Sequence, residues 1–294
     1  MAATLGDGQF EIDGVAFGGV WDAVKVDKVD WPQHSWDVQD TDNQFRSGIL
    51  MGSDLLRPGS LDFSLRTDTY SVNEAQDAAE ALAVPWLRGG EKDPRSLSCL
   101  RYRLGNRTRR VYGRGREFVH SLDQWTYAGT SPIAAGFKMV DPFFYADEER
   151  SVDIGYVPAV TGGLTFPIEF PIEFQGTGAA NVGGYIPDVG GTVPTPVIIE
   201  LMGPTQFAIV SGDGWTVAYD SPIAADQVVT IDTRYGFAVV YDNFGKVRNG
   251  NLTWKTNLSR ARITPGSETI SYAGYDLTGS SRARVRWRPA YHTY

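Results

Sequence analysis

Four side chains are the first candidates for catalysis or metal binding in this sequence: His34, Cys99, His120 and His292. A nucleophilic cysteine needs a base nearby, and a zinc site needs several ligands at characteristic spacings. The histidines are far apart, and no spacing among these residues matches a zinc ligand set. Cys99 lies in a strand-like stretch, which is typical of a structural thiol. We therefore expect no catalytic residue, no metal ligand and no cofactor.

Carboxylates lie close together in two places. Asp147, Glu148 and Glu149 are consecutive and would suit calcium, although a solvated charge run explains them more simply. Glu169 and Glu173 have the residue types of a glycosidase pair. They belong to a tandem Pro-Ile-Glu-Phe, in which the prolines favour an extended chain with its carboxylates in solvent. Neither group predicts an active site.

Two tryptophans are candidates for binding sugar. Trp215 and Trp254 lie in a strand-rich second half, and an exposed indole can stack on a sugar ring. A role in the core or at an interface is the other interpretation. A carbohydrate-binding sandwich that attaches to cell-wall glycan therefore remains an alternative function, and a hydrolase with an accessory sandwich is a third.

The composition limits the elements that could position these residues. The chain has 294 residues, 42% of them hydrophobic, with 33 Gly and 16 Pro, which favours strands and turns around a sizeable core. No apolar run is long enough for a membrane span, so we expect no membrane insertion. A single cysteine precludes an internal disulfide and is compatible with assembly in a reducing cytoplasm.

The first half contains one strong helix signal. Apolar residues at helical spacing run from Ala75 to Trp86, preceded by Ser71 and Glu74 in the positions of a capping box. Alternating apolar residues flank the turns Asp13-Gly14 and Gly105-Asn106, which predicts hairpins there. The polar segment 37–54 predicts an exposed loop or a long hairpin arm. The first half is therefore α+β with one helix.

The second half is predicted to be an all-β domain. Many short strands separated by turns are typical of a β-sandwich or jelly roll. In the last strand, arginines alternate with Ala283, Val285 and Trp287, which predicts one charged and one buried face. The expected strands are Pro196–Met202, Gln206–Val210, Trp215–Tyr219, Gln227–Asp232, Phe237–Tyr241, Asn251–Lys255, Glu268–Ala273 and Arg282–Arg288.

The sequence Asp141-Pro142-Phe143-Phe144-Tyr145 separates these halves. Proline biases Asp141 away from helix, so a strand should end there and a domain join should follow. We expect a mostly β protein with three parts. They are an α+β domain at 1–145, a Gly- and Pro-rich connector at 146–195, and a sandwich at 196–294.

Charge is distributed unevenly along the chain. The net charge is −8, with −10 in residues 1–94, +7 in 95–140 and −5 in 141–294. An otherwise acidic chain would repel DNA, so we expect no direct nucleic-acid recognition. Oppositely charged patches within one domain suit head-to-tail contacts between copies of the chain. Cross-strand pairing inside a single copy is the alternative.

Several segments, taken in their order along the chain, carry a family resemblance: Phe10–Gly14, Arg110–Arg114, Asp141–Tyr145, Thr195–Leu201, Ile231–Arg234, Thr264–Glu268 and Val285–Tyr291. Together they resemble the distal tail (Dit-like) proteins of long-tailed, non-contractile bacteriophages.

The resemblance implies a structural virion protein of the tail tip. In that family an N-terminal α+β domain forms a hexameric ring and a galectin-like sandwich follows it. The implied partners are other copies of the chain, the tail tube protein, tail hub or tip proteins and, further out, a receptor-binding protein.

We expect chelators to leave the stability of this protein unchanged, because no residue pattern predicts a structural metal. Thermal melting curves with and without EDTA should superimpose. A large drop in the melting temperature with EDTA would contradict this prediction, since a metal linked to folding contributes strongly to stability.

Overall fold

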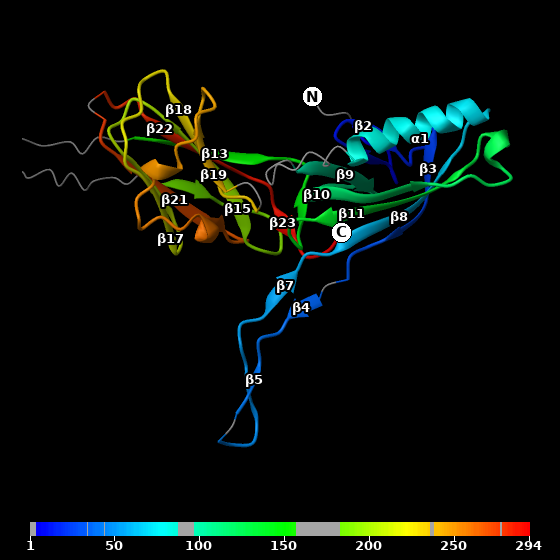
Figure 1. Ribbon diagram of the computed structural model, residues 1–294. Helices are drawn as coiled ribbons and strands as arrows, with labels where there is room; N and C mark the ends of the chain where they lie inside the picture. The colour runs from blue at the N-terminus through cyan, green and yellow to red at the C-terminus, as the bar shows by residue number, and fades with distance from the viewer. Residues whose placement is uncertain are drawn as a thin grey trace, which may run out of the picture. The chain divides into compact units, whose positions relative to one another are not determined.

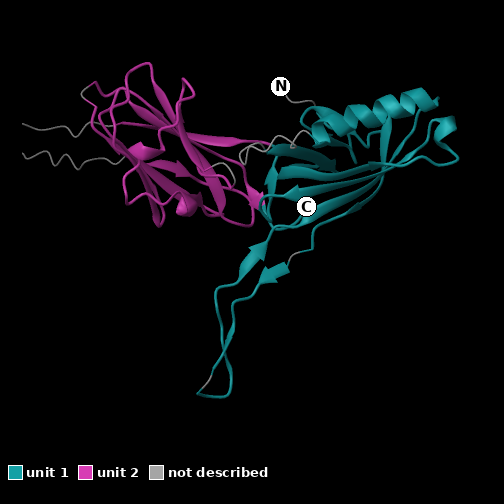
Figure 2. Cartoon of the chain, in the orientation of Figure 1, with its two compact units in different colours: residues 1–147, 291–294 teal, residues 148–290 magenta. Residues whose placement is uncertain are grey.

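The chain folds into two compact units (Figure 2). The computed structural model describes residues 4–33, 35–43, 45–87, 97–156, 183–235, 238–276 and 278–294. Unit 1 comprises Met1–Asp147 and Tyr291–Tyr294, and unit 2 comprises Glu148–Ala290. The chain therefore leaves unit 1 after Asp147 and returns to it at Tyr291. The Pro-Ile-Glu-Phe tandem lies outside the described residues.

A nine-stranded sheet and one α-helix form the body of unit 1 (Figure 1). The strand order is β2-β1-β9-β10-β11-β8-β3, and β12 pairs with both β10 and β23. The strands are β1 (Phe10–Ile12), β2 (Val15–Phe17), β3 (Val24–Asp30), β8 (Ser60–Thr67), β9 (Ser98–Leu104), β10 (Arg107–His120), β11 (Pro132–Met139), β12 (Phe144–Ala146) and β23 (Ala290–Tyr291).

Local sequence determines the hairpins of this sheet. The β1–β2 turn places Asp13 and Gly14 at positive φ, 45° and 94°, as a tight hairpin turn between twisted strands requires. In β8, Leu61, Phe63 and Leu65 are buried while the intervening polar residues are exposed. Both hairpins predicted from the sequence are confirmed.

The helix α1 (Val72–Leu87) covers one face of the sheet (Figure 1). Ser71 Oγ accepts a hydrogen bond from the backbone N–H of Glu74 at 3.3 Å, and the Glu74 carboxylate accepts one from the N–H of Tyr70 at 3.0 Å. These bonds satisfy donors that a helix start leaves open. At the far end, Trp86 is fully buried, and its Nε1 donates to the carbonyl of Gly136 at 3.1 Å.

Residues 35–43 and 45–57 form a hairpin arm that extends from the sheet of unit 1 (Figure 1). Of the two expectations for the segment 37–54, an exposed loop or a long hairpin arm, the structure has the hairpin arm. Between its two short ladders, Gly52 lies so close to Gln39 that an added Cβ would be 2.1 Å from the Gln39 carbonyl oxygen. The ladders pair β4 (Ser35–Asp37) with β7 (Leu55–Arg57), and β5 (Thr41–Asp42) with β6 (Ile49–Leu50).

Unit 2 has two sheets that share one apolar core. The first has the order β13-β22-β15-β18-β19, with β20 paired to β15, and the second has the order β14-β21-β16-β17. A mostly β fold with a single α-helix among the described residues confirms the predicted fold class. The strands are β13 (Arg150–Gly155), β14 (Gly184–Ile186), β15 (Thr195–Met202), β16 (Ala208–Gly212), β17 (Trp215–Tyr219), β18 (Val228–Asp232), β19 (Val239–Asp242), β20 (Arg262–Ile263), β21 (Glu268–Gly274) and β22 (Arg282–Trp287).

The alternating face of β22 is confirmed, and its arginines are used inside unit 2. Because β22 lies between β13 and β15, carboxylates of both neighbours reach it. Arg284 pairs with Asp153 at 2.6 Å, and Arg286 pairs with Glu200 at 2.7 Å. The charged face that the sequence predicted for this strand therefore holds neighbouring strands of one chain together.

The strand predicted at Asn251–Lys255 is wrong. This segment follows a 3-10 turn, η3 (Asn249–Asn251), and makes a single bridge from Leu252 to Tyr219 before turning again. The asparagines and glycine at 249–251 favour turn conformations over a continued ladder. As a result, Trp254 lies on a loop and not in a sheet.

We predict that Gly115→Ala destabilises unit 1, because a Cβ there would lie 2.0 Å from the carbonyl oxygen of Trp86 and 2.5 Å from its ring. Overpacking of this kind costs about 1–3 kcal/mol of unfolding free energy. Urea denaturation of both proteins measures the difference.

Gly155→Ala is the matched control for this prediction. A Cβ at Gly155 would meet nothing within 4 Å, so this variant should unfold within about 0.5 kcal/mol of the parent. Equal stability of the two variants would mean that Trp86 does not rest on the sheet at Gly115.

Candidate functional site

The predicted join residues form the last ordered turn before the chain leaves unit 1. The Asp141 carboxylate accepts hydrogen bonds from the backbone N–H of Phe143 at 2.9 Å and from the Tyr145 hydroxyl at 3.0 Å. Pro142 is compatible with this turn, because proline has no backbone N–H and the turn uses no hydrogen bond from that position. Phe144 is buried in the core of unit 1 and lies edge-on to Tyr102, with ring centroids 6.4 Å apart.

Asp147, the last residue of unit 1 before the crossing, is held by two arginines. Arg101 donates to both of its carboxylate oxygens, at 2.9 and 2.8 Å, and Arg110 donates to one of them at 3.0 Å. A further bond joins Arg101 to Glu11 on β1 at 2.8 Å. We call these four side chains the join cluster.

The cause of the join cluster lies in the register of the β9–β10 hairpin. Its turn places Arg101 directly opposite Arg110. Like charges at directly opposed positions destabilise a sheet unless an anion lies between them, and Asp147 supplies that anion. The register follows from the turn at Gly105-Asn106, so the sequence already contained the signal that these arginines need a shared partner.

The electrostatics of Asp147 follow from this arrangement. Burial alone would raise the pKa of its carboxyl group, but the hydrogen bonds from Arg101 and Arg110 outweigh burial and hold the pKa below its ordinary value. The hydrogen bond to Asp147 in turn raises the pKa of Arg101. Asp147 is therefore ionised in the folded protein over the whole neutral range.

The returning chain is held by the residue next to Arg110. The Arg109 guanidinium lies 3.6 Å from the ring centroid of Tyr291 and donates to the carbonyl of Thr293 at 3.0 Å. Tyr294 stacks on Trp31 with ring centroids 4.2 Å apart. Adjacent residues of β10 thus hold the outgoing and the returning chain.

The interpretation of Asp147, Glu148 and Glu149 as a solvated charge run is wrong for two of the three residues. Asp147 belongs to the join cluster, and Glu149 pairs with Arg286 at 2.9 Å, whereas Glu148 is exposed. The basic block at 95–140 is also used partly inside unit 1, through Arg101, Arg109 and Arg110. Cross-strand pairing therefore accounts for part of the charge pattern.

The arm presents an apolar surface to solvent. Phe45 at its tip is 93% exposed, and Met51 is 81% exposed. Exposed apolar strands of this kind usually serve as interaction surfaces, because they are otherwise an aggregation risk. The other large hydrophobic residues exposed on the arm are Trp36, Val38, Ile49, Leu50 and Leu55.

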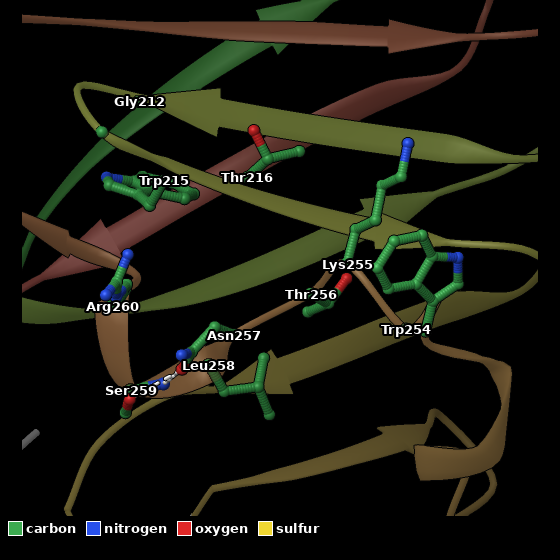
Figure 3. Close-up of a pocket in the computed structure, with 11 residues that line it drawn as sticks. Gly212, Trp215, Thr216, Trp254, Lys255, Thr256, Asn257, Leu258, Ser259 and Arg260 are labelled. Carbon is green, nitrogen blue, oxygen red and sulfur yellow. Dashed lines mark hydrogen bonds between the residues drawn. The ribbon is translucent and has the colours of Figure 1, made fainter.

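The two candidate tryptophans line one pocket of unit 2 (Figure 3). Trp215 is only 6% exposed and belongs to the core, so it cannot stack on a ligand. Trp254 is 89% exposed. The pocket has a volume of about 1140 Å³ and lies between the β16–β17 turn and the segment 254–260.

The candidate catalytic residues do not converge. Burial raises the pKa of the Cys99 thiol, which opposes the formation of a thiolate nucleophile. His120 lies 2.7 Å from the Ser131 hydroxyl, a pair that sequence reasoning missed, but Ser131 is fully buried and cannot reach a substrate. His292 lies against Phe143, and His34 lies outside the described residues.

The described residues also contain neither a metal-binding group nor a membrane-spanning helix. In those ranges, no three His, Cys, Asp or Glu side chains gather in a way that would hold a metal ion. The helix in the described part of the chain is also not long and apolar enough to cross a membrane.

Comparison with known proteins identifies the fold. No family model matches the sequence, and no curated protein matches it. Solved structures do match. The SPP1 Dit protein (gp 19.1), a paradigm of the hub adsorption apparatus in phages that infect Gram-positive bacteria, is 11% identical with a TM-score of 0.58, over 96% of this chain and 98% of that one.

The phage P2 baseplate contains a chain that also matches this fold. A chain of this baseplate in its activated conformation with Ca is 11% identical, with a TM-score of 0.60, over 97% of this chain and 99% of that one. The form with Sr gives 11% identity and a TM-score of 0.59 over the same shares. The resemblance to distal tail proteins that the sequence motifs indicated is therefore confirmed at the level of the fold.

We predict that Asp147→Asn destabilises unit 1 by about 3–5 kcal/mol, because it leaves two opposed arginines without their shared anion. Hydrogen exchange of the β9 and β10 amides measures this loss locally. The folded-state pKa of Asp147 is depressed, so its stabilisation is complete above about pH 3.9 and is lost as the pH falls through the lower folded-state pKa. The variant should lack this component of the acid transition.

Glu148→Gln removes a neighbouring exposed carboxylate and is the control. It should change the unfolding free energy by no more than about 0.5 kcal/mol. If the two variants exchanged at the same rate in β9 and β10, the join cluster would have no structural role.

Proposed function

We propose that this chain is a structural protein of a phage tail tip, which forms a hexameric ring between the tail tube and the hub or host-adhesion parts. The observation that carries the proposal is the fold match over 96–97% of this chain and 98–99% of the matched phage chains. A match confined to the sandwich would have little meaning, because sandwiches serve many functions. Here both units correspond to a single phage protein.

The same comparison supports a location in the virion and a role without catalysis. The matched proteins are parts of a hub adsorption apparatus and of a baseplate. On this proposal, the partners of the chain are further copies of itself, the tail tube protein, hub or tip proteins and a receptor-binding protein.

We place the contact between neighbouring copies on the arm. Its exposed apolar side chains would be buried by contact with another copy of the chain. A ring provides such a contact, because one patch of each copy binds a different patch of the next copy. The charge blocks contribute less than the sequence suggested, since Arg101 and Arg110 are satisfied by Asp147. The effect of salt on assembly separates the two contributions. Contacts between charges weaken as the salt concentration rises, whereas apolar contacts do not.

The alternative function is carbohydrate binding by unit 2. The observation that favours it is the exposure of Trp254 at the edge of a pocket. Carbohydrate binding is compatible with a tail-tip position, since both would serve attachment to a host. The candidate catalytic residues give a hydrolase no support, because burial opposes ionisation of Cys99 and the serine beside His120 is fully buried.

We predict that the protein assembles through its arm. Light scattering should give a species near six times 32.3 kDa. Asp37 pairs directly with Leu55, so residues 38–54 can be replaced by Asn-Gly to close a two-residue hairpin in the same register. This shortened protein should remain folded and monomeric, and the double variant Phe45→Ser, Met51→Ser should assemble more weakly.

Phe244→Ser is the matched control, because Phe244 is also exposed but lies in unit 2. It should assemble like the parent. A parent protein that remained monomeric at high concentration would count against the ring. Normal assembly of the shortened protein would show that the contact lies elsewhere.

A further inference from the structure

The pocket of unit 2 has the floor and walls of a preformed site (Figure 3). The Thr256 hydroxyl accepts a hydrogen bond from the N–H of Ala218 at 3.0 Å and donates to the Ala218 carbonyl at 3.2 Å, which fixes the loop to β17. Asn257 accepts bonds from the N–H and the hydroxyl of Ser259, at 3.1 and 2.6 Å. A loop held in this way loses little conformational freedom when a ligand binds.

The pocket is positively charged within an acidic protein. Its lining contains Lys255 and Arg260 and no carboxylate, although the whole chain has a net charge of −8. Among the described residues, no ion pair joins either of these cations to a carboxylate, whereas most arginines of unit 2 are paired. Two unpaired cations in a concave site attract anions and exclude cations.

Trp254 adds an apolar surface to this charge. Its indole is almost completely exposed because the loop carries it outward, so its position gains nothing from core packing. The Lys255 ammonium lies 5.4 Å from the centroid of the ring. An apolar ring face stacked on the indole would therefore place its own substituents beside a cation.

From these observations we propose that the pocket binds an anionic glycan, a sugar chain whose units carry carboxylate or phosphate groups. The C–H face of a sugar ring stacks on Trp254, and its anionic group meets Lys255 or Arg260. Trp215 forms the buried floor and does not contact the sugar. A neutral glycan would use the indole alone, and a free anion would use the cations alone. The proposal rests on the alternative function, carbohydrate binding by unit 2, and names the class of its ligand. It does not depend on assembly of the ring.

Calorimetric titration of the full chain tests the proposal with matched probes. Trigalacturonate is compared with its uncharged methyl ester, and glucose 6-phosphate with glucose and with inorganic phosphate. We expect at least one anionic sugar to bind at least about tenfold more tightly than both its neutral counterpart and phosphate. Binding of trigalacturonate identifies a carboxylate glycan, and binding of glucose 6-phosphate identifies a phosphate glycan.

Variants assign the binding to this pocket. Trp254→Ala and the double variant Lys255→Ala, Arg260→Ala should each weaken binding about tenfold, and all three side chains are exposed enough for the fold to survive their removal. Phe244→Ala and Lys246→Ala remove an exposed aromatic residue and an exposed cation of unit 2 outside the pocket, and should bind like the parent.

Three results would overturn the proposal. They are no binding of either anionic sugar up to about 10 mM, equal binding of the charged and neutral sugars, and unchanged binding by Trp254→Ala. Binding of inorganic phosphate as tightly as glucose 6-phosphate would reduce the pocket to a simple anion site and would also contradict it.

Discussion

The two-unit organisation depends on one electrostatic constraint, the opposition of Arg101 and Arg110 across the β9–β10 hairpin. Two guanidinium groups at paired positions of a sheet require an anion, and the anion is the residue at which the chain leaves unit 1. The exit point is therefore fixed by a charge requirement of the sheet itself. The residue before Arg110 in the same strand, Arg109, binds the returning chain through Tyr291 and Thr293. Two adjacent residues of β10, Arg109 and Arg110, thus bind the chain where it leaves unit 1 and where it returns.

Regular elements could be predicted from the sequence where one local signal dominated. The capping residues Ser71 and Glu74 predicted the start of α1, and the alternation of Leu61, Phe63 and Leu65 predicted β8. At 251–255 the apolar residues suggested a strand, but the preceding turn residues determined the structure. Pairing partners were the harder problem, because a carboxylate such as Asp147 looks solvated until the register of a distant hairpin is known.

The residues of the candidate site also differ in how far the sequence could predict their roles. The join sequence was found because proline and aromatic residues have strong local effects. The separation of Trp215 from Trp254 into a core residue and an exposed residue could not be predicted, since both follow similar patterns in sequence. At 11% identity the matched phage proteins share the fold of this chain and few particular side chains. Surface features such as the arm and the charged pocket therefore have to be argued from this chain alone.

The return of residues 291–294 to unit 1 has a consequence for the synthesis of the protein. A ribosome makes residues 1–147 first, and the whole of unit 2 follows before Tyr291 and Tyr294 exist. Until then Trp31 and Phe144 lack the ring that covers them, and Arg109 lacks its partners. Nascent unit 1 therefore carries an uncovered aromatic surface while unit 2 is being made. Transiently exposed apolar surface of this kind promotes aggregation during synthesis, and the finished protein covers it.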